Sequence, residues 1–329
     1  MPGIAARTLT ALAGLLAAVA PVALAGCAGQ GGDDLSKVTY PRTVVPPAGQ
    51  QPGADSGRLS AEGLRLIDPC GLLDPAVLAE FGVPDDNVGQ DFDGCRNYMS
   101  DAGGASLNLS VRVGDPLTSS DVDKASEPIG EFLARTTTVE GACFVTLVMD
   151  GVDPPVGVTV QSGYQTADPC PAARAVAADA ARRLPTTAPV RQPVSASLLP
   201  LDPCTLPGAL PGTAVPRAAS PDAFGLHQCS WRNPDGAELE LEFGYRDDPA
   251  RQPAPPAPEP VDLGGGVTGH QVRTEQTFPQ CKLSWLHLAG GAGEGEVVDI
   301  EVRDIRDTGL DVCGAAVTFA KGLLPKLPT

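Results

Sequence analysis

The chain has 329 residues, with 23 lysines and arginines against 40 aspartates and glutamates, so its formal net charge is −17 at pH 7. This charge repels phosphate backbones and anionic lipid headgroups, which excludes nucleic-acid binding. It would attract a cationic partner, although solubility alone also explains such an excess of acids.

The first 26 residues have the order of a secretory signal peptide. A single positive charge, Arg7, precedes an apolar stretch from Leu9 to Leu24, and small residues follow. The stretch ends in Leu24-Ala25-Gly26-Cys27, which resembles the bacterial lipobox, where the cysteine thiol receives diacylglycerol and the preceding peptide bond is then cut. The resemblance implies a signal peptide at 1–26 and a lipid on Cys27 that holds the protein on the extracytoplasmic face of the cell membrane. An ordinary signal peptide or an uncleaved membrane helix is the alternative, since the apolar run approaches the roughly 18 residues that could span a bilayer.

The segment after Cys27 lacks hydrophobic periodicity. Residues 27–62 are rich in Gly, Pro, Gln and Asp, a composition that predicts a flexible tether. Eight cysteines remain beyond Cys27, an even number in an oxidising compartment, and four disulfides are therefore expected. No two of them stand two to four residues apart, so zinc-ribbon spacing is absent and neither a metal nor a cofactor is predicted.

An internal repeat dominates the rest of the chain. Leu66-Ile67-Asp68-Pro69-Cys70 recurs as Pro200-Leu201-Asp202-Pro203-Cys204, and the next cysteine follows 25 positions later in both cases. Two homologous units at 63–184 and 197–329, joined by a Pro- and Thr-containing linker at 185–196, are the simplest account. The repeated spacing predicts the disulfides Cys70–Cys95, Cys143–Cys170, Cys204–Cys229 and Cys281–Cys313.

Each unit contains the same order of predicted elements. A short helical turn is expected near the first cysteine, as at 74–81, and alternating runs at 107–113 and 238–243 predict half-buried strands. Further strands are predicted at 143–149 and 281–288 and at 156–160 and 297–302. Ala-rich helices at 171–184 and 314–324 close the units. This order predicts an α+β fold in which each unit is an antiparallel sheet with flanking helices.

These features resemble a family of actinobacterial lipoproteins grouped as domain of unknown function 3558. Asp68-Pro69-Cys70-Gly71-Leu72-Leu73 and Cys229-Ser230-Trp231 carry the resemblance, which would cover 64–329 as two tandem copies. The first unit departs from the pattern with Cys95-Arg96-Asn97-Tyr98, and the second with Thr205-Leu206-Pro207. The family implies no established activity. The layout is also similar to extracellular sensor domains of mycobacterial receptor serine/threonine kinases, in which disulfides join neighbouring cysteines.

No residue set forms a catalytic signature. The histidines are His227, His270 and His287, all in the second unit, and we expect them to be surface or half-buried strand residues rather than triad bases. Gly264 to Gly269 has dinucleotide-fingerprint spacing, but a strand pattern follows it, which predicts a turn. The acid pairs Asp85 with Asp86 and Asp91 with Asp93 are interpreted as loop acids rather than acid–base or calcium sites. Trp231, Tyr98 and Trp285 are predicted to pack in the core on disulfides.

The sequence therefore predicts a non-enzymatic binding or interaction module of the cell envelope, with a wall ligand or envelope protein as partner. A lipid or glycolipid carrier and an envelope hydrolase using carboxylates are the alternatives. A long apolar cavity would favour the carrier, and two carboxylates converging in a cleft would favour the hydrolase.

Overall fold

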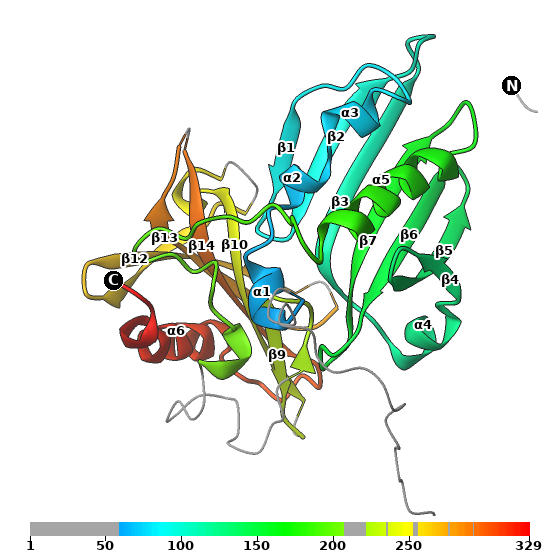
Figure 1. Cartoon of the computed structure of the whole chain (residues 1–329). Helices are drawn as coiled ribbons and strands as arrows, with labels where there is room; N and C mark the ends of the chain where they lie inside the picture. Colours follow the sequence, from blue (N-terminus) through cyan, green and yellow to red (C-terminus); the bar gives the residue numbers. More distant parts are fainter. Residues whose placement is uncertain (1–58, 207–221, 235, 253–255, 276, 292) are drawn as a thin grey trace, which may run out of the picture. The chain divides into compact units, whose positions relative to one another are not determined.

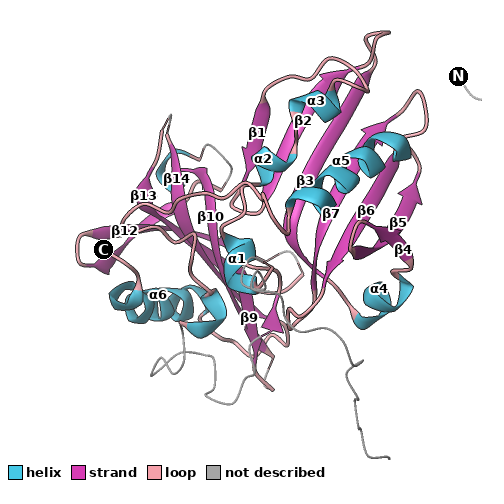
Figure 2. Cartoon of the chain, viewed as in Figure 1, coloured by secondary structure: helices cyan, strands magenta, loops and turns pink. Residues whose placement is uncertain are grey.

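The computed structural model describes residues 59–206, 222–234, 236–252, 256–275, 277–291 and 293–329. The signal peptide, Cys27 and the tether as far as residue 58 lie outside the described residues. Within them, the two repeats belong to one compact unit. Each repeat consists of a seven-stranded antiparallel sheet with helices (Figures 1 and 2), so the predicted α+β class is confirmed.

The first repeat opens with three short helices and closes with a long one. Its elements are α1 (Ala61–Arg65), α2 (Pro69–Leu72), α3 (Pro75–Leu78), β1 (Asn87–Gln90), β2 (Gly94–Ser100), β3 (Ser106–Pro116), α4 (Ser119–Lys124), β4 (Glu127–Ile129), β5 (Phe132–Val139), β6 (Ala142–Met149), β7 (Val156–Tyr164) and α5 (Cys170–Arg183). Because α1 starts at Ala61, residues 61 and 62, which the sequence assigned to the tether, are helical.

The second repeat has the same order of strands. Its elements are η1 (Pro203–Thr205), β8 (Asp222–Ala223), β9 (Gln228–Arg232), β10 (Ala237–Asp247), η2 (Pro249–Arg251), β11 (Glu259–Gly264), β12 (Val267–Thr274), β13 (Gln280–Ala289), β14 (Glu294–Asp304), α6 (Val312–Leu323) and η3 (Leu324–Lys326). The sheets run β1-β2-β3-β7-β6-β5-β4 and β8-β9-β10-β14-β13-β12-β11. Strand for strand the two orders are identical, which supports the tandem repeat.

All four predicted disulfides are confirmed. The repeated Asp-Pro-Cys motif positions Cys70 and Cys204, the first cysteines of the first disulfide in each repeat. Asp68 accepts a hydrogen bond from the Cys70 backbone N–H, and Asp202 does the same for Cys204. Proline occupies the first helical position, where no backbone donor is needed. The motif thus starts a short helix and points its cysteine at the second strand of the sheet, β2 or β9.

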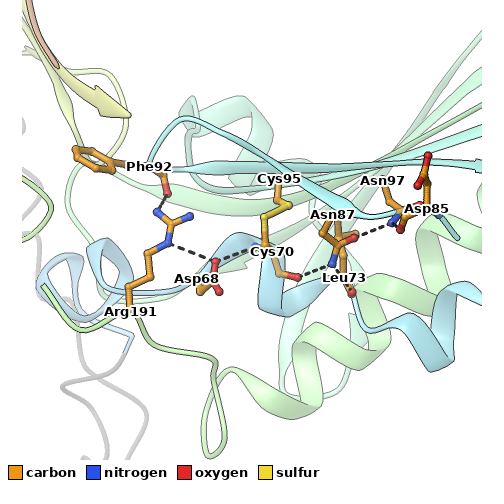
Figure 3. Close-up of a disulfide and its surroundings, with 9 residues drawn as sticks. All are labelled: Asp68, Cys70, Leu73, Asp85, Asn87, Phe92, Cys95, Asn97 and Arg191. Carbon is orange, nitrogen blue, oxygen red and sulfur yellow. Dashed lines mark hydrogen bonds and ion pairs between the residues drawn. A yellow bond between two sulfur atoms is a disulfide. The ribbon is translucent and has the colours of Figure 1, made fainter. Parts of the chain in front are cut away.

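The linker is hydrogen bonded to the first repeat. Asp68 N–H donates to the Pro189 carbonyl and Arg191 N–H donates to the Leu66 carbonyl, so this segment runs antiparallel beside Ile67. The Arg191 guanidinium also binds the Asp68 carboxylate and the Phe92 carbonyl, as Figure 3 shows beside the Cys70–Cys95 bridge. Residues 189–191 are therefore an ordered part of the fold.

One face of each sheet forms a core. In β3 the side chains of Leu107, Leu109, Val111 and Val113 are buried on the side of α1, α2 and α5, and in β10 Leu239, Leu241 and Phe243 are buried on the side of α6. Trp231 and Trp285 lie in the second core, as predicted. Tyr98 does not, and that prediction was wrong, because Cys95, Asn97 and Met99 face inward and the two-residue period turns Tyr98 outward with 48% of its surface exposed.

Candidate binding site

Each sheet has a second face, opposite its helix, which we call its open face. In the first repeat, Cys143, Val145 and Leu147 of β6 point to α5, so the alternate residues point away. The open face of the first repeat consists of Gly94, Arg96, Tyr98 and Ser100 of β2, Ser106, Asn108, Ser110 and Arg112 of β3, Gly157, Thr159, Gln161 and Gly163 of β7, Ala142, Phe144, Thr146 and Val148 of β6, and Leu133, Arg135, Thr137 and Val139 of β5.

These five strands add one carboxylate to the open face of the first repeat, that of Asp115, which lies opposite Gly157 after a bulge in β3. The other charged strand residues of this face are Arg96, Arg112 and Arg135, and the remainder are hydroxyl, amide, small or apolar side chains. In a chain of net charge −17, a surface of this extent whose strands carry three arginines and one carboxylate is a marked local departure.

The corresponding face of the second repeat is acidic and internally paired. Register places Glu240 where the first repeat has Ser110, Glu242 where it has Arg112, and Glu301 where it has Gln161. Arg303 bonds Glu238 at 3.0 Å and Glu301 at 2.6 Å, and Lys282 lies 3.3 Å from Asp299. The two repeats thus share a scaffold and differ in the chemistry of this face.

A concavity of about 340 Å³ lies at one end of the open face of the first repeat. It is lined by Asp115, Pro116, Leu117, Asp121, Arg135, Thr137, Phe144, Thr146, Val148 and Thr159. The Thr146 and Thr159 hydroxyls lie 3.0 Å apart on neighbouring strands. The lining combines hydroxyls, one aromatic ring and an arginine–aspartate pair, which are groups that orient a small polar ligand.

Asp121 holds the rim of this concavity in place. Its carboxylate accepts hydrogen bonds from the Thr118 backbone N–H and hydroxyl, forming a capping box at the start of α4, and it also binds the Arg135 guanidinium. The hydrogen bond from the Thr118 side chain, helped by the Thr118 backbone N–H and Arg135, lowers the pKa of Asp121. Both of its oxygens are therefore occupied, and the carboxylate is ionised at neutral pH.

The pKa of Asp115 is shifted in the opposite direction. Burial raises its pKa against the hydrogen bond from Thr159 and the charge of Arg112, whose Nε lies 3.4 Å away. Two carboxylates whose environments shift their pKa values apart are the pattern of acid–base pairs in hydrolases. This is the one described feature that favours the hydrolase alternative, and the engagement of both Asp121 oxygens weakens it.

His227 lies where the two repeats meet. We expected a surface or half-buried histidine, and that was wrong: only 2% of His227 is exposed. Its Nδ1 lies 2.7 Å from the Asp93 carboxylate of the first repeat and its Nε2 lies 2.7 Å from the Leu199 carbonyl, while Phe92 packs on the ring. His227 and Asp93 are 134 positions apart in sequence, so the burial of His227 results from contacts between the two repeats.

Other loop acids also bind across the repeats. Asp91 accepts a hydrogen bond from the Tyr245 backbone N–H at 2.8 Å and binds the Arg246 guanidinium, which in turn contacts Glu242 and Asp299. The negative charges around Arg246 raise its pKa despite its burial. Arg65 similarly contacts Asp202 at 2.8 Å. These charged groups are structural, and local sequence patterns gave no signal for their partners.

Two larger hollows lie elsewhere. One of about 580 Å³, lined mainly by apolar residues such as Leu263, Val267 and Leu327, lies beside His287 and Lys321. Another of about 500 Å³ is lined by Phe92, Arg191, Val194, Tyr245 and others.

The remaining predicted site residues fall as follows. Gly265 and Gly266 form the turn between β11 and β12, and His270 lies on β12 as the strand pattern predicted. The turn is shorter than expected, because Gly264 ends β11 and Val267 to Gly269 already belong to β12. His287 is half-buried on β13, with Nε2 3.0 Å from the Ala196 carbonyl. Among the described residues, no group of three or more His, Cys, Asp or Glu side chains is arranged to hold a metal ion.

Comparisons with known proteins give no family for the chain. No protein-family model matches it, and no curated protein matches it. Among solved structures, a match is the di-domain ARO/CYC BexL from the BE-7585A biosynthetic pathway, at 12% identity and a TM-score of 0.13 over 81% of this chain and 89% of that chain. In the part of the chain that the structure describes, no helix is long and apolar enough to cross a membrane.

Proposed function

We propose that the protein is a cell-envelope lipoprotein, anchored through Cys27, that binds an envelope component non-enzymatically through the open face of the first repeat. The lipobox-like Leu24-Ala25-Gly26-Cys27 supports the anchor, and the motifs shared with domain of unknown function 3558 support an envelope setting.

The difference between the two open faces carries this proposal. Two repeats with the same strand order and equivalent disulfides keep the same scaffold. The second repeat closes its face with ion pairs such as Arg303 with Glu238, whereas the side chains of Ser110, Gln161 and Thr137 have no hydrogen-bond partner among the described residues. Polar groups without internal partners on a hollowed face are available to a ligand.

The test transplants the acids of the second repeat onto the first. The double variant Ser110→Glu/Gln161→Glu places carboxylates where the second repeat has Glu240 and Glu301. Whole protein purified in detergent should be retained on isolated envelopes, and this variant should lose retention without a change in its unfolding midpoint. The matched control, Glu240→Ser/Glu301→Gln, should bind like the wild type. Equal retention of both variants would show that another surface binds.

The hydrolase alternative rests on Asp115 and Asp121 in one concavity. If it holds, the same face binds a substrate and Asp115 donates the proton, since burial raises its pKa. The carrier alternative would use the 580 Å³ apolar hollow in the second repeat, which would leave envelope retention insensitive to changes in the first repeat.

A further inference from the structure

The open face of the first repeat also indicates the class of ligand. We propose that it binds a neutral, linear glycan that lies across β2, β3, β7 and β6 between the rings of Tyr98 and Phe144. This inference rests on the proposed function, because it assigns a ligand to the same face.

The two aromatic side chains stand at opposite ends of a level strip. Register pairs Tyr98 with Asn108, Asn108 with Gly163 and Gly163 with Ala142, and Phe144 is two residues from Ala142 on β6. With strands about 4.8 Å apart, the two rings are separated by roughly 15 Å, a span comparable with a short oligosaccharide. Aromatic faces stack on the C–H surfaces of pyranose rings, so two such rings can hold both ends of a linear sugar chain.

Small residues keep the strip between the rings open. A Cβ atom built on Gly163 would meet no other atom within 4 Å, and its neighbour Ala142 has only a methyl group. In the row from Tyr98 to Ala142, Asn108 is therefore the one longer side chain, and the surface over β7 and β6 is low. An extended ligand can lie across this low part of the face.

The polar groups beside the strip match hydroxyl groups. Asn108, Ser110, Gln161 and Thr137 offer neutral donors and acceptors, and amide or hydroxyl side chains bond sugar hydroxyls without a charge mismatch. The arginines are already engaged. Arg135 binds Asp121, Arg112 lies 3.4 Å from Asp115, and Arg96 lies over the Tyr98 ring at 5.5 Å and bonds its hydroxyl at 3.0 Å. This pairing leaves little net charge on the face, which favours a neutral ligand over an anionic one.

Differential treatment of envelopes tests the ligand class. Periodate destroys those glycans whose sugars carry free vicinal diols, while protease removes proteins. Whole protein in detergent should be retained on protease-treated envelopes. On periodate-treated envelopes most of this retention should be lost. Retention that survives periodate and is lost with protease would overturn the glycan proposal and leave the binding-module proposal intact. If the Ser110→Glu/Gln161→Glu variant is retained on untreated envelopes as strongly as the wild type, both the glycan proposal and the binding-module proposal are overturned.

Ring substitutions test the geometry. With neutral linear tetrasaccharides of glucose, N-acetylglucosamine, mannose and arabinose as probes, at least one should bind in calorimetric titrations. Tyr98→Leu and Phe144→Leu keep apolar bulk and remove the ring, so each should weaken that affinity by about tenfold. Tyr98→Phe retains the ring and should bind close to the wild type. The matched variants Arg232→Leu and Lys282→Leu, at the equivalent positions of the second repeat, should have no effect. Failure of all four probes, or equal loss in the second-repeat variants, would overturn the proposal.

Discussion

The imidazole of His227 and the carboxylate of Asp93 lie 2.7 Å apart and join the second repeat to the first. On its other side, the ring faces the Leu199 carbonyl, also at 2.7 Å. Both partners are acceptors, so both ring nitrogens must carry protons and the buried ring is an imidazolium. Burial and the charge of Arg65 oppose this protonation, but the Asp93 charge, its hydrogen bond and the Leu199 carbonyl outweigh them and raise the pKa of His227.

This pair predicts that stability falls as pH rises. A folded-state pKa above the ordinary value of 6.5 means that the pair stabilises the fold fully below that pH and loses its contribution as pH rises through the folded pKa. Urea midpoints should therefore decline across that window in the wild type and remain flatter in His227→Gln. The control His287→Gln, at a half-buried histidine, should keep the wild-type profile. A His227→Gln curve parallel to the wild type would contradict the assignment.

Removing Asp93 should also be costly at neutral pH. Asp93→Ala removes the carboxylate that keeps the buried imidazole charged and leaves its Nδ1 without a partner, so the free energy of unfolding should fall by roughly 3 kcal/mol. Asp86→Ala, at an exposed loop acid, should change it little. Urea unfolding followed by circular dichroism measures both, and equal effects of the two substitutions would show that Asp93 is not a structural partner.

Each disulfide should contribute separately to stability. Cys70–Cys95 and Cys204–Cys229 both link residues 25 positions apart, so by chain entropy each should stabilise its repeat by roughly 3.5 kcal/mol. Double replacement by alanine of either pair should lower the unfolding free energy by similar amounts. Peptide mapping under non-reducing conditions checks the pairing, and any bridge between the repeats would contradict it.

Gly114 should tolerate no side chain. It has a φ of +85°, and a Cβ built on it would lie 2.3 Å from Cγ of Leu226 in the second repeat. Gly114→Ala should therefore destabilise the protein by about 2 kcal/mol or more, from strain and overpacking together. Gly89→Ala is the control, since nothing lies within 4 Å of its Cβ position. Thermal midpoints that match for the two variants would refute the close approach.

The lipid anchor is tested at Cys27. Cys27→Ser removes the thiol that would be acylated, so the protein should move from the membrane fraction to the soluble one. Mass spectrometry of the wild-type N-terminus should find an acylated Cys27 as its first residue. An unacylated wild-type N-terminus would exclude the anchor and leave an ordinary exported protein.

Local patterns were sufficient for the scaffold. The Asp-Pro-Cys motif combines a helix cap with a cysteine, and the alternation in 107–113 and 238–243 matches β3 and β10. The prediction for Tyr98 was wrong because it followed the residue type. The two-residue period counted from Cys95 places Tyr98 on the exposed side of β2. A third Asp-Pro-Cys, in which Asp168 accepts a hydrogen bond from the Cys170 backbone N–H just before α5, was missed.

The candidate site could not be predicted because it depends on register across five strands. Ser110, Gln161 and Phe144 come together only once β3, β7 and β6 are paired. The buried charges depend equally on contacts between repeats. Nothing near His227 in the sequence indicates Asp93, and Arg246 binds acids from both halves of the chain. Sequence periodicity reports which face of an element is buried, but not which distant charge it meets.

The two repeats exchange one apolar side chain each. Leu226 of the second repeat is buried in the first core, and Phe92 of the first is buried in the second. Either half produced alone would have a cavity in its core and an exposed apolar side chain, and it would therefore be prone to aggregation. Each repeat therefore completes the core of the other, and packing couples the two halves even though the open faces of their sheets differ in chemistry.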